Sequence, residues 1–336
     1  MATKLIEGFD VYPTVLGVLG VESRWVVEGS SGLSLVAGRF GGQGLRGAGS
    51  NSGVSAELGG GPTQEGAAGV AMMIQVASSL SREIVLADAS NTPQVTLAID
   101  NLGRMLAYRG TTSGTFLATT PVAMSIGVWY YVEVEFRIDN PAGFIRVYVN
   151  GALLIDFTGN TQSVAGVNTV ARLGLLGGAA TVVVDDVYAK SIATRLGESR
   201  IETLLPSADS AVAFTPNAGT ENFSRVNEAL VDGDTTYVYS STVGAEDLYE
   251  IADMTSIPEQ IHAVQTRIVA KKDDAATRAV KVGLKPGTSA TVYGSDFYLS
   301  SSYTTKTDIY DLNPATSAPW TKTAIDGLKV GQKITI

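Results

Sequence analysis

A chain of 336 residues is too long for one ordinary β-sandwich and long enough for two domains of moderate size. Its composition, 45% hydrophobic and 17% charged, is that of a globular protein and excludes an intrinsically disordered one. The net charge of −9, without a Lys/Arg cluster, argues against nucleic-acid binding, and the lack of cysteine excludes disulfides, thiolate metal sites and cysteine nucleophiles.

Residues 1–20 lack the apolar stretch and the cleavage site of a signal peptide, and no run of about 18 apolar residues follows them. We therefore expect neither an export signal nor insertion into a membrane.

Short alternating segments separated by polar turns predict β-strands through most of the first 190 residues. The clearest passage is 129–159, in which Val132, Val134 and Phe136 face one way while Glu133 and Glu135 face the other. A turn at 139–143 and an Asn-Gly hairpin turn at 150–151 make this passage a three-stranded meander. The glycine-rich stretch 38–53 predicts tight turns, because it lacks the pattern of a phosphate-binding loop.

The strand pattern breaks near Thr194 and resumes after Pro206. We therefore predict an all-β protein of two jelly-roll-type β-sandwich domains, residues 1–197 and a smaller domain, 198–336, for assembly or attachment. In the second domain, residues 260–287 predict a hairpin with a turn at 271–277. Short helices are predicted at 256–260 and 317–331, and in the latter four apolar residues share one face: Trp320, Ala324, Ile325 and Leu328.

The first domain resembles the concanavalin A-like lectin/glucanase (laminin G-like) family in "GFDVY", "GRFGGQGLRGAG", the 129–159 passage and "TVVVDDVYAK". In that family the Trp-containing strand, the Asn-Gly hairpin and the late Asp-Asp strand are fold markers and not the sugar site. Here Asp185 and Asp186 lie within a strand pattern, with Asp186 on the face of Val182 and Val184, so the resemblance does not extend to calcium-supported sugar binding.

The order of motifs over nearly the whole chain is similar to that of tailed-bacteriophage virion structural proteins. The later motifs are "LGESRIETLLPSAD", "VNEALVDGDTTYV", "AVQTRIVAKKDDAATRAVKVGLK" and "DLNPATSAPWTKTAIDGLKVG". This resemblance implies a virion component, assembled in the host bacterial cytoplasm, with other virion proteins and further copies of the chain as partners.

Few residues offer chemistry. Glu133 and Glu135 have the spacing of a glycosidase pair but lack the glucanase signature, so solvated outer-face charges are the preferred interpretation. His262 has no second histidine to complete a triad or a zinc site. "DGDTTYV" at 232–238 favours an Asx-type turn over half of a calcium loop.

Trp129 and Tyr131 lie on the glutamate-bearing face and are the candidates for contact with a glycan or with a neighbouring subunit. We expect no catalytic residue, no cofactor and no metal. The preferred function is a non-enzymatic, tail-associated virion protein that touches a host surface glycan. The alternatives are a capsid decoration or cement protein and a carbohydrate-binding adhesion module, while a glycan hydrolase is disfavoured.

Overall fold

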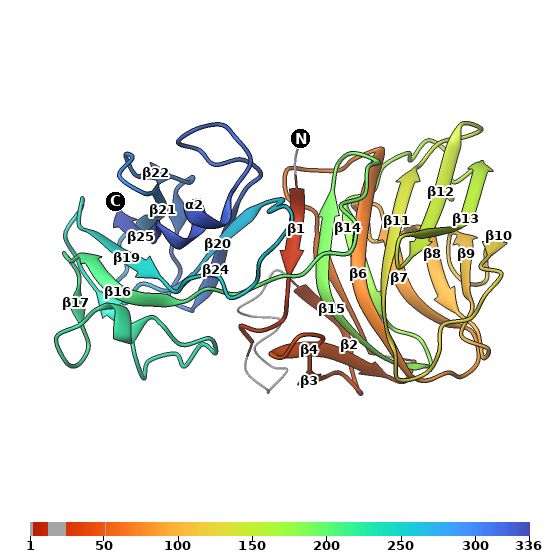
Figure 1. The fold of residues 1–336 in the computed structure, drawn as a ribbon, viewed down its shortest axis with the longest axis horizontal. Helices are drawn as coiled ribbons and strands as arrows, with labels where there is room; N and C mark the ends of the chain where they lie inside the picture. Colours follow the sequence, from red (N-terminus) through yellow and green to blue (C-terminus); the bar gives the residue numbers. More distant parts are fainter. Residues whose placement is uncertain (1–2, 13–24, 51) are drawn as a thin grey trace. The chain divides into compact units, whose positions relative to one another are not determined.

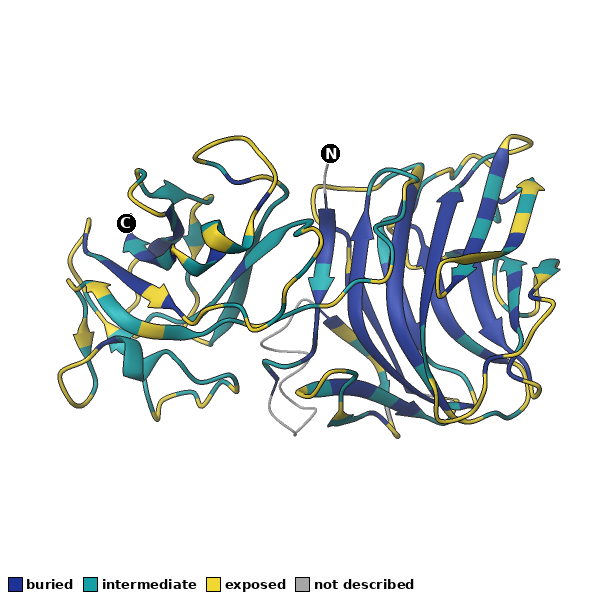
Figure 2. Cartoon of the chain, viewed as in Figure 1, coloured by how far each residue is buried: buried dark blue, intermediate teal, exposed yellow. Residues whose placement is uncertain are grey.

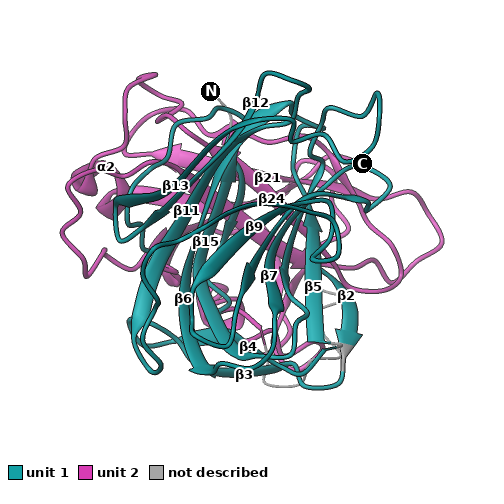
Figure 3. Cartoon of the chain, turned by 90° about the vertical axis from the view of Figure 1, so that its right-hand side faces the viewer, with its two compact units in different colours: residues 1–10, 14–20, 24–201 teal, residues 11–13, 21–23, 202–336 magenta. Residues whose placement is uncertain are grey.

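The computed structural model describes residues 3–12, 25–50 and 52–336 (Figure 1). The chain divides into two compact units (Figure 3). Among the described residues, unit 1 contains 3–10, 25–50 and 52–201, and unit 2 contains 11–12 and 202–336. The main passage from one unit to the other lies between Ile201 and Glu202, shortly after the predicted join at 197. Both units consist of antiparallel strands with very little helix, which confirms the all-β fold class.

Unit 1 is a sandwich of an eight-stranded and a seven-stranded sheet. The eight-stranded sheet has the order β13-β12-β11-β6-β15-β4-β3, and β1 also pairs with β15. Its strands are β1 (Thr3–Glu7), β3 (Ser34–Ala37), β4 (Gln43–Ala48), β6 (Glu65–Val76), β11 (Trp129–Arg137), β12 (Gly143–Val149), β13 (Ala152–Gly159) and β15 (Thr181–Lys190).

The second sheet of unit 1 has the order β10-β9-β8-β7-β14-β5-β2. Its strands are β2 (Trp25–Ser30), β5 (Ser52–Glu57), β7 (Ser81–Ala87), β8 (Pro93–Ile99), β9 (Met105–Arg109), β10 (Thr115–Thr119) and β14 (Arg172–Leu176). The central strands of both sheets are buried along most of their length (Figure 2).

The predicted meander is confirmed, since β11 pairs with β12 and β12 with β13. Val132, Val134 and Phe136 are buried, as the alternation predicts. Asn150 and Gly151 both have positive φ, 46° and 79°, which is the backbone that the hairpin turn requires.

Unit 2 has a six-stranded sheet of order β16-β19-β25-β21-β22, with β23 also paired to β21, and two two-stranded ribbons. The sheet strands are β16 (Pro206–Ala211), β19 (Glu246–Ile251), β21 (Ala279–Pro286), β22 (Val292–Tyr293), β23 (Phe297–Tyr298) and β25 (Leu328–Ile334). The ribbons pair β17 (Thr215–Pro216) with β18 (Val238–Tyr239), and β20 (Val264–Ala270) with β24 (Thr304–Tyr310). A 3-10 turn, η2 (Phe223–Arg225), follows β17.

The core of unit 2 joins the β20–β24 ribbon to the six-stranded sheet. Val264 and Tyr310 of the ribbon pack against a buried cluster of Ile251, Leu284, Trp320, Ile325 and Leu328. The short helix α2 (Lys322–Asp326) supplies Ile325, and the Thr321 side chain caps its N-terminus by accepting from the Ala324 N–H. The four apolar residues predicted at 320–328 all pack in this core, but the single helical face is wrong, because Trp320 precedes α2 and Leu328 begins β25.

Two local predictions in unit 2 are wrong. Residues 260–287 do not form a hairpin, because β20 pairs with β24 while β21 pairs with β25, so the two segments belong to different sheets. Residues 256–260 contain no helix. No helix among the described residues has the length and apolar character needed to cross a membrane.

Candidate functional site

The outer face of the eight-stranded sheet in unit 1 carries a stripe of small residues on β6. Ala67 and Ala71 lie there beneath the buried rings of Tyr131 from β11 and Tyr188 from β15. Gly69 lies between them, and a Cβ at this position would collide with the Tyr188 ring and come within 3.0 Å of the Tyr131 ring. The small residues therefore allow two tyrosine rings to lie flat against the sheet.

The chain returns across this face after β15. Residues 191–201, which we call the covering segment, leave the end of β15 and contact the outer side of β11 and β15. Leu196 of this segment packs against the buried tyrosines. Its backbone N–H donates to the Tyr188 hydroxyl at 2.9 Å. An aromatic floor and a backbone contact thus fix the middle of the covering segment.

Glu133 of β11 is the main anchor of the covering segment. Its side chain is only 1% exposed and accepts three hydrogen bonds. The donors are the Tyr188 hydroxyl at 2.6 Å, the Gly197 N–H at 2.8 Å and the Arg195 guanidinium at 3.0 Å. A buried carboxylate with this many donors is stabilised as a charged group, and it stabilises the segment that supplies two of them.

Glu135, two residues further along β11, makes a second anchor. It accepts from the Arg195 N–H at 3.0 Å and from the Tyr148 hydroxyl at 3.2 Å. The Arg195 guanidinium also lies 4.5 Å from the centre of the Tyr148 ring. Both glutamates therefore hold Arg195, one through its side chain and one through its backbone.

The end of the covering segment is held at an irregular point of β15. The pairing of β15 with β6 shifts between Asp185 and Tyr188, and Asp186 there has a φ of 49°. This irregularity turns the Asp186 carboxylate to the outer side, where it accepts from the Ile201 N–H at 2.7 Å. The prediction that Asp186 shares the face of Val182 and Val184 is therefore wrong, because strand alternation does not continue through a bulge.

Arg39 fastens the same end of the covering segment. Its guanidinium lies 3.6 Å from Asp186, pairs with Glu198, and donates to the Ser199 carbonyl at 3.3 Å. Its backbone N–H donates to Asp185 at 2.8 Å. Burial, and then the neighbouring Asp186 charge, raise the pKa of Asp185 to about 7.

The glycines of 38–44 let backbone approach these carboxylates. A Cβ at Gly38 would lie 2.6 Å from an Asp185 oxygen, and one at Gly42 would collide with the Asp10 carboxylate. Asp10 in turn accepts from the Gln43 N–H at 2.8 Å. The prediction of tight turns and close approach is confirmed here. "GFD", "GRFGGQG", "DD" and "LGESR", which are far apart in the sequence, meet in this one network.

The sequence-predicted site residues fall within or beside this network. Tyr131 is 1% exposed and its hydroxyl donates to the Asp186 carbonyl at 3.0 Å, so its ring offers no surface to a glycan or a subunit. Trp129 is half-buried and packs against the same aromatic cluster. The description of Glu133 and Glu135 as solvated charges is wrong, because the covering segment buries both.

Two other predicted features have structural roles. The Asp232 carboxylate accepts from the Thr236 N–H at 3.2 Å and from its hydroxyl at 2.8 Å. These bonds close a local turn, as predicted, but over four residues rather than the two of an Asx turn. His262 is half-buried and lies two residues before the start of β20. No group of three or more His, Asp or Glu side chains in the described ranges is arranged to hold a metal ion.

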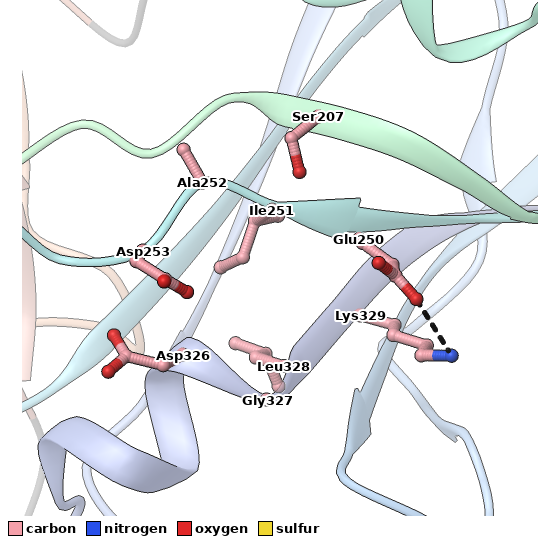
Figure 4. Close-up of a pocket in the computed structure, with 9 residues that line it drawn as sticks. All are labelled: Ser207, Glu250, Ile251, Ala252, Asp253, Asp326, Gly327, Leu328 and Lys329. Carbon is pink, nitrogen blue, oxygen red and sulfur yellow. Dashed lines mark ion pairs between the residues drawn. The ribbon is translucent and has the colours of Figure 1, made fainter.

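Unit 2 carries a shallow pocket of about 450 Å³ (Figure 4). Asp253 and Asp326 lie on one side of it, and at its other side Glu250 lies 3.5 Å from the Lys329 ammonium. The hydrogen bond from Lys322 is the main cause that lowers the pKa of Asp326. The Met254 N–H also donates to this carboxylate at 3.0 Å. Asp326 is thus already engaged in connecting α2 to the end of β19.

Sequence reasoning missed the covering segment itself. Arg195 and Gly197 lie 60 to 64 residues further along the chain than the glutamates of β11 that they contact. The one available signal was the break of the strand pattern near Thr194, which indicates that this stretch does not continue the sheet.

No protein-family model and no curated protein matches the chain. Among solved structures it is similar to alginate lyase Aly36B, with 12% identity and a TM-score of 0.38 over 58% of this chain and 99% of that one. The carbohydrate-binding module CBM66 from Bacillus subtilis has 13% identity and a TM-score of 0.37 over 51% of this chain and 97% of that one. A sialidase has 14% identity and a TM-score of 0.43 over 56% of this chain, which spans only 18% of that protein. Likenesses this distant do not establish an activity.

Proposed function

We propose that this chain is a non-catalytic structural protein of a tailed-bacteriophage particle, in which unit 1 is a closed scaffold that anchors the segment leading into unit 2. The observation that carries the structural role is the covered sheet face. Glu133 and Glu135, which have the spacing of a glycosidase pair, are used to bind Arg195 and Gly197 of the same chain.

The particle setting rests on the sequence resemblance. Several of the motifs that carry it, from "GFD" to "LGESR", form the network that holds the covering segment. These motifs therefore form hydrogen bonds within the chain itself. Such a role fits a structural component of an assembly in which unit 2 makes the contacts with other proteins. We favour a tail-associated position, with capsid decoration as the alternative, and other virion proteins as partners.

Labelling of intact particles with antibody and gold, viewed by electron microscopy, tests this proposal. We expect label on the particle, at the tail or its fibres. Label spread evenly over the head would replace the tail position by capsid decoration. Particles without any label would exclude the virion role and leave carbohydrate binding as the function to test.

Carbohydrate binding is the second candidate, and an exposed aromatic pair favours it. Phe116 on the edge strand β10 is 51% exposed and packs edge-on against Tyr108 of β9, with ring centres 5.7 Å apart. Such rings present an apolar surface beside polar groups, which suits the faces of sugar rings. The proteins named above as similar in structure include an alginate lyase and a carbohydrate-binding module. Carbohydrate binding is therefore a function to test directly.

For this candidate we expect a glycan identified on an array to bind the Phe116→Ala variant at least tenfold more weakly, a loss of about 1.4 kcal/mol. Isothermal titration measures the difference. Tyr298→Ala is the matched control, because Tyr298 is an exposed aromatic residue of unit 2. Equal affinity in all three proteins, or no binding on the array, would reject the aromatic pair as a sugar site.

A further inference from the structure

Exposed apolar side chains gather on three loops of unit 1 that follow β6, β8 and β10. Six of them, which we call the end patch, are between 39% and 61% exposed: Val76, Leu80, Leu102, Val122, Ile126 and Val128. Isolated apolar residues are normal on a protein surface, whereas a continuous group marks an interaction site.

Backbone hydrogen bonds join the three loops into one surface. The loop after β10, residues 120–128, donates from Met124 N–H to the Gly103 carbonyl at 2.9 Å, beside Leu102. Three residues later, Gly127 N–H donates to the Ile74 carbonyl at 2.8 Å, near Val76. The loop therefore runs from the β8–β9 turn to the end of β6 and places its own apolar side chains between them.

Two further hydrogen bonds stabilise the loop. The Ser125 N–H donates to the Tyr130 hydroxyl at 3.0 Å, and the Thr120 hydroxyl donates to the Val122 carbonyl at 2.8 Å. Met124, Ser125 and Gly127 thus bind the loop to residues outside it, and a loop held in this way loses little conformational freedom when it binds a partner, which favours association.

The chemistry of the end patch points away from charged partners. Residues 110–132, which supply three of the six side chains, contain no Asp, Glu, Lys or Arg, and beside Leu102 the Arg104 guanidinium pairs with Asp100 at 2.7 Å. An anionic lipid surface or a nucleic acid attracts Lys and Arg, and this stretch has neither.

We propose that the end patch is a contact surface between copies of this chain. Two copies that meet through the same surface need a patch that is complementary to itself, and an apolar surface whose largest loop carries no charge meets that condition. Acidic surfaces of like-charged copies repel each other, so association concentrates where charge is absent.

The proposed contact is made by side chains rather than by a shared sheet. β10 is an edge strand and leads directly into the loop, but its pairing with β9 shifts between Phe116 and Ala118. Such a bulge interrupts the regular edge that another strand needs. A stable contact of this kind buries about 800 Å² on each partner, so residues between the six apolar side chains also take part.

Sedimentation velocity of the full chain over a wide range of concentration tests the proposal. We expect the wild-type sedimentation coefficient to increase with concentration. The double variant Val122→Glu/Ile126→Glu places two negative charges at the centre of the end patch, and we expect it to remain monomeric at every concentration.

The matched control is Val212→Glu/Val243→Glu, which adds the same charges at two exposed valines of unit 2 and leaves the end patch intact. We expect it to associate as the wild type does, and circular dichroism verifies that all three proteins are folded. A wild-type chain that stays monomeric throughout, or an end-patch variant that associates like the control, would overturn the proposal. A wild-type chain that stays monomeric while a different protein binds the patch would overturn it equally.

Discussion

Glu133→Ala is expected to lower the free energy of unfolding of unit 1 by about 3 kcal/mol and to release the covering segment. The change removes a buried acceptor from the Tyr188 hydroxyl, the Gly197 N–H and the Arg195 guanidinium at once. Tyr188 and Gly197 each lose a buried hydrogen-bond partner. Arg195 is one-third exposed and can bind water instead, so the loss of stability stays below the largest values for a broken buried ion pair. Calorimetry of the full chain measures the change.

Release of the covering segment can be measured separately by limited proteolysis, because trypsin cleaves after Arg195 and Arg200. In the wild type the backbone of 195–197 is hydrogen-bonded to Glu133, Glu135 and Tyr188, which shields these bonds. We expect Glu133→Ala to be cut there at least tenfold faster, with mass spectrometry identifying the fragments. Glu133→Gln, which keeps an acceptor for Gly197 and Tyr188 but loses the ion pair, is expected to fall between the two.

Glu57→Ala is the matched control for these experiments. Glu57 also pairs with an arginine, Arg172 at 3.0 Å, but its side chain is 81% exposed. The Arg172 side chain is 12% exposed, but it keeps its hydrogen bond to the Ser55 hydroxyl at 3.1 Å when Glu57 is removed. Because water reaches the Glu57 carboxylate, the pair contributes less than about 1 kcal/mol, so both stability and cleavage should stay close to those of the wild type. Wild-type cleavage rates in Glu133→Ala would show that Glu133 does not hold the covering segment.

The second large effect concerns Glu83 of β7 and the pH dependence of stability. Burial raises the pKa of this carboxyl to about 8, although the Ser81 hydroxyl donates to it at 2.5 Å. In the unfolded chain the same group titrates near 4.5. Between pH 4.5 and pH 8 the unfolded state has lost this proton and the folded state still holds it, so the contribution of Glu83 to stability is complete below pH 4.5 and declines until pH 8.

The expected decline is at most about 5 kcal/mol, at roughly 1.4 kcal/mol for each pKa unit. Glu83→Gln keeps the shape of the neutral acid and cannot ionise. We therefore expect this variant to equal the wild type below pH 4.5 and to exceed it in free energy of unfolding by several kcal/mol at pH 8 and above.

Denaturant unfolding of wild type and variant between pH 4 and pH 9 measures this difference. Glu57→Gln removes an exposed carboxyl from the same unit and is expected to give a difference that is small and nearly constant with pH. A Glu83→Gln difference that is equally constant would show that the Glu83 carboxyl is ionised in the folded protein at neutral pH.

The sequence by itself determined those structural features that depend only on residues close together in the chain. Alternation from Val132 to Phe136 predicted a buried strand face, and Asn150-Gly151 predicted a hairpin with positive φ. The sequence likewise predicted a turn after Asp232, whose side chain bonds Thr236 four residues later. Each of these depends on the local backbone period or on a side chain that bonds its own turn.

Only the tertiary structure decided what lies against each face. Alternation correctly placed Glu133 opposite the core, but a segment some sixty residues later in the chain covers that side and turns a surface charge into a buried anchor. Likewise β20 and β21 are consecutive and alternate as a hairpin does, yet they pair with β24 and β25 in different sheets. Strand period fixes which side chains share a face, whereas partners distant in sequence are selected by the packing of the whole unit.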